Sequence, residues 1–148
     1  MFEQALPAAV AQSDAEARSF AVLYIDVNRF KLVNDTHGHD AGDAMLIVIA
    51  ARLRAVLRTA DEAFRLSGDE FALILAPGRS SAELAAVKAS IADGMAEPIM
   101  LPSGELIEAS LSVGSACYPD DSADARELLR HADAAMYAAK AGRAHRDC

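Results

Sequence analysis

The stretch RLSGDEFALIL, residues 65–75, limits most strongly what this chain can fold into. Two apolar runs, EAFRL and EFALILA, flank a Ser-Gly-Asp turn, and this pattern is typical of a β-hairpin. Asp69 and Glu70 stand side by side next to the apolar run, where an ordinary core strand does not carry carboxylates. The sequence therefore predicts a hairpin with two acids at its tip, which either face solvent or belong to a site.

The hydrophobic pattern of the rest of the chain places this hairpin in an α+β domain. FAVLYIDV, residues 20–27, is a nearly continuous apolar run and predicts a buried strand. Apolar residues have helical spacing at about residues 41–58, in SAELAAVKASIADGMA and in ADARELLRHADAAMYAAKAG. Extended runs lie on both sides of a Pro-Ser-Gly turn at 102–104. This order contains the pattern βαββαβ, which predicts an antiparallel-rich, ferredoxin-like sheet, and we expect its helices on one face.

Pairing of the first strand with the hairpin would create a cluster of acids. Asp26 ends the first strand and would then lie beside Asp69 and Glu70. Carboxylates brought together repel one another unless a cation or a proton intervenes, and oxygen ligands without His or Cys favour Mg²⁺ or Mn²⁺. Such sites commonly bind triphosphates. The alternative is that the hairpin acids are solvated, although Gly68 beside them would let backbone approach a ligand.

Composition excludes several other classes. The chain has 148 residues with 53% hydrophobic residues, which suits one domain with a real core. Its net charge of -8 argues against DNA, RNA or an acidic membrane as a partner. No apolar segment is long enough to span a membrane, and two cysteines without a disulfide pattern fit a cytoplasmic protein.

Four ordered segments resemble the GGDEF family, the diguanylate cyclases. SGDEF resembles the family signature, YIDVNRFKLVNDTHGHDAGD its first metal-binding block, and LSVGSACYPDD and ELLRHADAAMYAAKAGR its C-terminal blocks. They cover residues 20 to 143. The resemblance implies a nucleotidyl-cyclase, palm-like core and the condensation of two GTP molecules into cyclic di-GMP with release of pyrophosphate. It also implies a homodimer, because each domain binds one GTP, and dependence on Mg²⁺ or Mn²⁺.

The resemblance assigns roles to the acid cluster. Asp26 and Asp69 match metal-binding carboxylates, with the Val27 carbonyl as a further ligand. Glu70 matches an acid implicated in metal binding and in activating the 3′-hydroxyl. Gly68 matches a position where backbone passes close to the nucleotide.

Further matches concern the nucleotide. Asn34 and Asp43 match the residues that read guanine, whose N1–H and N2–H donors suit a carboxylate; alternatively, both cap the helices around THGHDAG. Phe30 and Lys31 match the turn whose backbone amides hold the outer phosphates, and Lys140 matches a phosphate-binding lysine.

An inhibitory product site is also implied. Arg58 and Asp61, in RTAD, match an Arg-x-x-Asp pair that binds cyclic di-GMP. Arginine suits a guanine edge or a phosphate, and an aspartate suits guanine N1 and N2. The alternative is a helix end with a cation in its last turn.

The sequence also departs from the family pattern. Ser67 replaces the first signature glycine and would be strained at positive φ. Asn28 stands where a second aspartate is usual, and KAGR is one residue short, which puts the placement of Arg143 in doubt. The usual lead-in is absent, so we expect residues 1–148 to be one domain cut from a longer signalling protein with a sensor or phosphodiesterase domain. Ser67 and Asn28 favour an alternative function, a degenerate regulatory module that binds GTP or cyclic di-GMP.

Overall fold

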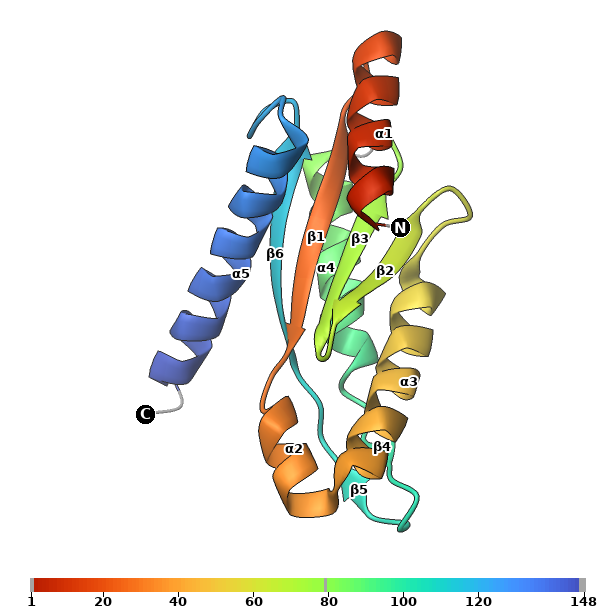
Figure 1. The fold of residues 1–148 in the computed structure, drawn as a ribbon, viewed down its shortest axis with the longest axis vertical. Helices are drawn as coiled ribbons and strands as arrows, with labels where there is room; N and C mark the ends of the chain where they lie inside the picture. Colours follow the sequence, from red (N-terminus) through yellow and green to blue (C-terminus); the bar gives the residue numbers. More distant parts are fainter. Residues whose placement is uncertain (1, 79, 147–148) are drawn as a thin grey trace.

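The computed structural model describes residues 2–78 and 80–146, except for the side chains of residues 142–146. Figure 1 shows a central sheet with helices packed around it. The helices are α1 (Phe2–Glu16), α2 (Phe30–His37), α3 (His39–Val56), α4 (Ser81–Gly94) and α5 (Ala125–Arg146). The strands are β1 (Phe20–Val27), β2 (Glu62–Ser67), β3 (Glu70–Leu75), β4 (Ile99–Met100), β5 (Leu106–Ile107) and β6 (Leu111–Tyr118).

The main sheet has the strand order β2-β3-β1-β6, and each neighbouring pair is antiparallel. The predicted βαββαβ core and the predicted hairpin β2–β3 are thus confirmed. Strands β4 and β5 form a separate two-stranded ribbon around the predicted Pro-Ser-Gly turn. This order puts β1, which carries Asp26, directly beside the hairpin strand β3.

Helices cover both faces of the main sheet, and the prediction of helices on one face was wrong. One buried cluster joins β1 and β3 to α3 and α4, and a second joins the other face of the same strands to α1 and α5. The cause is visible in β1, where Leu23 and Ile25 belong to the first cluster and Val22 to the second. A strand that is apolar on both sides needs cover on both sides.

Helix α5 lies unusually close to the sheet at one glycine of β6. A Cβ atom added at Gly114 would lie 2.1 Å from the backbone nitrogen of Met136 and 2.2 Å from the carbonyl oxygen of Ala132. Real side chains do not tolerate such distances, so only glycine fits here. This close approach fixes the height of α5 over the sheet and therefore the position of Lys140 further along the helix.

The helix boundaries agree with the sequence pattern to within two residues at α3. Gly38, with φ of +94°, separates α2 from α3, as the THGHD segment predicted. The predicted capping box of α4 is present: Ser80 Oγ accepts from the Glu83 N–H at 3.1 Å, and Glu83 Oε1 accepts from the Ser80 N–H at 3.4 Å. In the described part of the chain, no helix is long and apolar enough to cross a membrane.

Candidate active site

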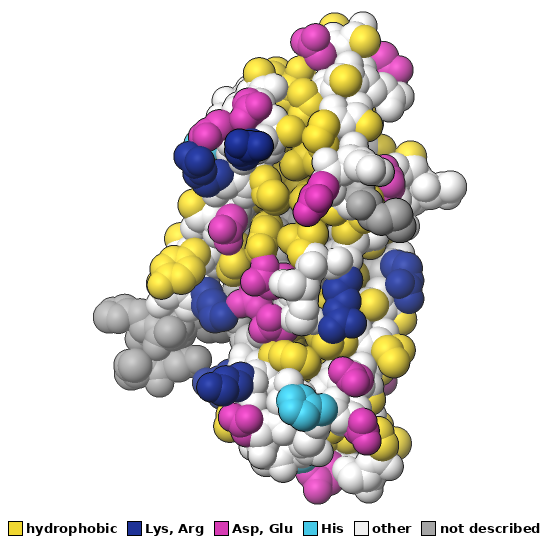
Figure 2. All heavy atoms as spheres, in the orientation of Figure 1, with side chains coloured by type: hydrophobic (Ala, Val, Ile, Leu, Met, Phe, Trp, Pro, Cys, Tyr) yellow, Lys and Arg dark blue, Asp and Glu magenta, His cyan; other side chains and the backbone are white. Residues whose placement is uncertain are grey.

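The predicted acids meet at one end of the main sheet. Asp26 and Glu70 are direct partners in the ladder between β1 and β3, so their side chains leave the sheet on the same face. The Val27 N–H donates to the Asp69 carbonyl oxygen at 3.0 Å, which holds the hairpin tip against the end of β1. Figure 2 shows acidic side chains gathered over this part of the molecule. The register and this hydrogen bond therefore bring Asp26 beside the hairpin acids Asp69 and Glu70, which are distant from it in the sequence.

The carboxylates of this cluster lie close together with too little positive charge nearby to balance them. Burial and the neighbouring charge of Asp26 raise the pKa of Asp69 above its usual value. Asp26 itself is only 7% exposed, and Lys140 Nζ lies 2.5 Å from its Oδ2 atom. This hydrogen bond to Asp26 raises the pKa of Lys140. The ammonium group of Lys140 therefore supplies part of the positive charge that the carboxylates need.

The donor set fits one hard divalent cation. Asp26 and Asp69 supply two neighbouring carboxylates, and the carbonyl of Val27, whose N–H is bonded to Asp69, is a third candidate ligand. Among the side chains that the structure describes, in residues 2–78 and 80–141, no three from His, Cys, Asp or Glu are arranged closely enough to hold a metal ion by themselves. Two carboxylates and a carbonyl leave coordination positions for phosphate oxygens, which is the arrangement typical of Mg²⁺ bound with a nucleotide.

Glu70 is held by a residue that the sequence analysis did not identify. The hydroxyl of Tyr24 donates to Glu70 Oε2. Burial and the Glu70 carboxylate raise the pKa of Tyr24, which keeps the phenol protonated as a donor. A sequence signal was present, because Tyr24 precedes Asp26 by two residues and so shares its face of the strand.

The signature hairpin accommodates its variant residue without strain. Among the described non-glycine residues, positive φ occurs at Ala17 and Arg29, and Ser67 is not one of them. Ser67 ends β2 beside a register irregularity, and Gly68 has a φ of +32°. The Arg65 side chain closes the turn by donating from Nε to the Gly68 carbonyl at 3.0 Å. The backbone therefore gives no reason for glycine at position 67.

The second departure, Asn28, is satisfied by two serines. Its Nδ2 atom donates to Ser110 Oγ at 3.0 Å, and its Oδ1 atom accepts from Ser112 Oγ at 2.7 Å. An aspartate could accept both hydroxyls but could not donate to Ser110. Asn28 thus ties the end of β1 to β6 and removes one negative charge from the neighbourhood of Asp26.

The predicted guanine-reading residues lie where α2 touches α3. A Cβ atom added at Gly42 would lie 1.9 Å from Asn34 Oδ1 and 3.2 Å from the Phe30 ring. Asn34 Oδ1 is buried and has no hydrogen-bond partner in the part of the chain that the structure describes. Asp43 follows Gly42 directly and is exposed. A buried oxygen without a partner costs stability, and a ligand donor would satisfy it.

Helix capping does not explain these two residues. The N-cap positions of α2 and α3 are Arg29 and Gly38, and neither has a side-chain cap in the described structure. Arg29 adopts a left-handed conformation with φ of 59°, which costs about 1 kcal/mol for a residue with a side chain. It directly precedes Phe30 and Lys31, so the strained turn is the one predicted to hold phosphates.

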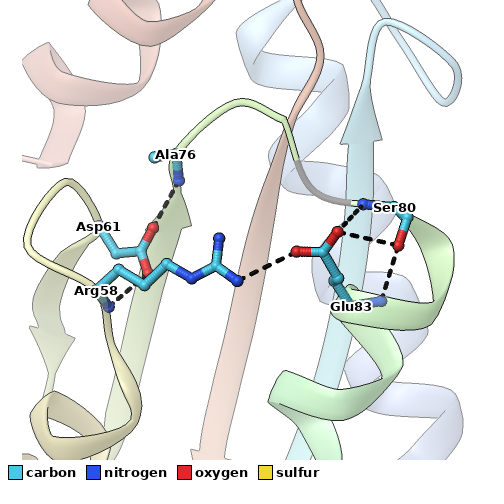
Figure 3. A network of polar contacts seen from close by, with 5 residues as sticks. All are labelled: Arg58, Asp61, Ala76, Ser80 and Glu83. Atoms are coloured by element: carbon cyan, nitrogen blue, oxygen red, sulfur yellow. Dashed lines mark hydrogen bonds and ion pairs between the residues drawn. The ribbon is translucent and has the colours of Figure 1, made fainter.

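Figure 3 shows the surroundings of Arg58 and Asp61, the predicted product-binding pair. Asp61 is buried, and its carboxylate accepts the Arg58 N–H at 2.8 Å and the Ala76 N–H at 2.7 Å. The Arg58 guanidinium is exposed and lies 3.1 Å from Glu83 Oε2, which belongs to the capping box of α4. Arg58 lies beyond the last residue of α3, so it is not a cation in a final helical turn.

Asp61 thus has a structural task that its motif did not reveal, and Glu83 is a partner of Arg58 that the sequence analysis missed. The predicted role of Arg143 concerns a side chain outside the described residues. Tyr24, Glu83 and the two serines around Asn28 all owe their positions to pairing between distant segments.

Several known proteins are similar to this chain in sequence and in fold. The family model described as "Diguanylate cyclase, GGDEF domain" matches residues 1–146. The diguanylate cyclase TpbB of Pseudomonas aeruginosa is 43% identical over 139 residues, which are 94% of this chain and 32% of that protein. A bifunctional diguanylate cyclase and cyclic di-GMP phosphodiesterase, MucR of the same organism, is 39% identical over 95% of this chain and 20% of its own length. The chain thus spans a third or less of these two relatives.

Solved structures show the same fold. The crystal structure of the GGDEF domain of TpbB from Pseudomonas aeruginosa matches with a TM-score of 0.92 and 42% identity, over 95% of this chain and 88% of that one. The GGDEF domain of DgcB from Caulobacter crescentus, solved in complex with cyclic di-GMP, matches with a TM-score of 0.87 and 28% identity, over 95% of this chain and 83% of that one.

Proposed function

This chain belongs to the GGDEF family of diguanylate cyclase domains, and from this premise we propose that it condenses two GTP molecules into cyclic di-GMP, releasing two pyrophosphates. The observation that carries the proposal is the meeting of Asp26, Asp69 and Glu70 at one end of the sheet, with Lys140 against Asp26. Acids on different strands gain nothing from this proximity in the fold itself, since they repel one another.

In this proposal the cluster binds one Mg²⁺ or Mn²⁺ ion through Asp26, Asp69 and the Val27 carbonyl. Such an ion neutralises charge on the phosphates and lowers the pKa of the attacking hydroxyl. Glu70 takes the proton of the 3′-hydroxyl as the oxygen attacks the α-phosphate. With such an ion held by Asp26, Lys140 would be free to hold phosphate oxygens instead of Asp26.

The guanine base binds between α2 and α3. Asn34 Oδ1, which has no partner within the described residues, accepts from guanine, and Asp43 accepts from N1–H and N2–H. Adenine lacks this pair of donors and would leave the acid unpaired, which favours GTP over ATP. The backbone amides of Phe30 and Lys31, after the strained turn at Arg29, hold the outer phosphates.

A single domain holds one GTP, so two copies must face each other for both bonds to form. We propose a homodimer as the active species, with product inhibition at the exposed Arg58. The bifunctional relative with a phosphodiesterase activity supports a place for residues 1–148 as one domain of a longer signalling protein. The net charge of -8 supports GTP rather than DNA or RNA as the ligand, and the scarcity of cysteine supports the cytoplasm.

The proposal is tested by incubating the purified chain with GTP and Mg²⁺ or Mn²⁺ and resolving the products by chromatography. We expect cyclic di-GMP from the wild type and none from Glu70→Gln. Glu62→Gln is the matched control, because Glu62 is an exposed acid at the far end of the same hairpin. Calorimetric binding of GTP or cyclic di-GMP without turnover would replace the cyclase by the regulatory module that Asn28 favours.

A further inference from the structure

Tyr24 lies in a gap between two small residues on neighbouring strands. In the ladders of β1, Ala72 of β3 stands opposite Tyr24 on one side and Gly114 of β6 on the other. Neither offers a large side chain on this face, and α5 presses directly on Gly114. The two ladder partners of Tyr24 therefore have no side chain large enough to prevent its ring from leaning along the strands.

The ring leans toward the catalytic end of the sheet. Glu70 is two residues before Ala72 on β3, which makes it the diagonal neighbour of Tyr24, within reach of a long aromatic side chain. The Tyr24 hydroxyl donates to Glu70 Oε2. A neutral phenol thus contacts the acid that activates the 3′-hydroxyl in the proposed function.

Glu70 needs such a contact because its direct neighbour is another acid. Asp26 stands opposite Glu70 on the same face, and Lys140, the cation that contacts Asp26 among the described side chains, forms no ion pair with Glu70. Repulsion from Asp26 would move an unrestrained Glu70 carboxylate away from the site. The hydrogen bond from Tyr24 fixes Oε2, and within the described residues Oε1 has no hydrogen-bond partner.

We propose that Tyr24 is a positioning residue of this cyclase, which holds the Glu70 carboxylate in its reactive orientation and determines which of its oxygens faces the 3′-hydroxyl. The proposal rests on the cyclase function argued above. A residue of this kind acts through Glu70, so its loss should affect the chemical step more than GTP binding.

The test compares Tyr24→Phe with Tyr118→Phe. Both changes remove one tyrosine hydroxyl that donates to a carboxylate, but Tyr118 donates to Asp14 at 3.3 Å, outside the acid cluster. We expect Tyr24→Phe to lower kcat about tenfold, because small misplacements of reacting groups are costly, and to leave KM for GTP within about twofold. Tyr118→Phe should change neither constant. A kcat of Tyr24→Phe within twofold of the wild type would overturn the proposal.

A second measurement does not depend on turnover. Thermal unfolding without nucleotide or metal is compared for the wild type, Tyr24→Phe, Glu70→Ala and the double variant. We expect Tyr24→Phe to lower the Tm of the wild type but not that of Glu70→Ala. Additive shifts would show that Tyr24 does not hold Glu70 and would refute the proposal even if the chain makes cyclic di-GMP. Conversely, if the Tm shifts of Tyr24→Phe and Glu70→Ala are coupled but the chain forms no cyclic di-GMP, the result counts against the proposed function and not against the contact between Tyr24 and Glu70.

Discussion

Replacing Asp61 by alanine is expected to destabilise the fold by about 2–4 kcal/mol, although its motif assigns this residue to ligand binding. The carboxylate is buried and accepts backbone N–H groups from Arg58 and Ala76, at 2.8 and 2.7 Å. It thereby ties the loop after α3 to the end of β3. Hydrogen bonds to a charged group contribute about 1.5–3 kcal/mol each, and alanine leaves two donors without this acceptor. Both contacts are only partly buried, so water can replace part of the lost interaction and the total stays below the sum of two such bonds.

Urea unfolding monitored by circular dichroism measures this change, and a fall in Tm of about 5–12 °C should accompany it in a chain of this length. Asp61→Asn keeps one accepting oxygen and should lose about half as much. Arg58→Ala is the matched comparison, because it leaves the backbone N–H of residue 58 in place and removes only an exposed ion pair. A loss below about 1 kcal/mol in Asp61→Ala would refute the reasoning. If Asp61→Ala destabilises the fold as expected, Arg58→Ala is the better variant for testing product inhibition, because it removes only an exposed ion pair.

Three further predictions concern the cap of α4, the α5 contact and the acid cluster. Glu83→Gln removes the charge that competes for Arg58, so calorimetry should show cyclic di-GMP binding about two- to fivefold tighter, and unchanged affinity would contradict this role. Gly114→Ala places a Cβ atom 2.1 Å from the Met136 nitrogen and should cost about 3 kcal/mol in urea unfolding; a near-neutral result would mean that α5 is not fixed there. Burial and the charge of Asp26 raise the pKa of Asp69 in the folded chain. The fold therefore favours the protonated form of Asp69, and the stability that this form contributes is lost as the pH rises through the raised pKa. Without divalent cation, Asp69→Asn should therefore be more stable than the wild type at pH 7, with the difference closing toward pH 4 and also on adding Mn²⁺.

The sequence was most informative about the strands whose existence and pairing follow from their own apolar pattern and from the turn that joins them. The apolar run at 20–27 and the turn at Ser67–Asp69 predicted β1 and the hairpin, and pairing them predicted the meeting of Asp26 with Glu70. This inference works because side chains alternate with a period of two and because an antiparallel register is fixed by the turn. The two-sided cover of the sheet was missed, although the same apolar run implied it.

Contacts that depend on how the helices and loops pack against the sheet could not be predicted from a single sequence. The contact between Arg58 and Glu83 depends on where α4 packs, and the exclusion of a side chain at position 114 depends on the height of α5. The double anchorage of Asp61 is likewise tertiary, and a four-letter motif does not reveal it. Such contacts are set by the packing of layers, for which local periodicity carries no signal.

The most direct test of the central claim is the rate of cyclic di-GMP formation as a function of protein concentration, with saturating GTP and Mn²⁺. Two half-sites must meet, so the account predicts that the rate per protein molecule rises with concentration until the dimer is fully populated, and that Glu70→Gln abolishes it. A chain that binds GTP but forms no cyclic di-GMP at any concentration would contradict the claim, and so would turnover that persists in Glu70→Gln.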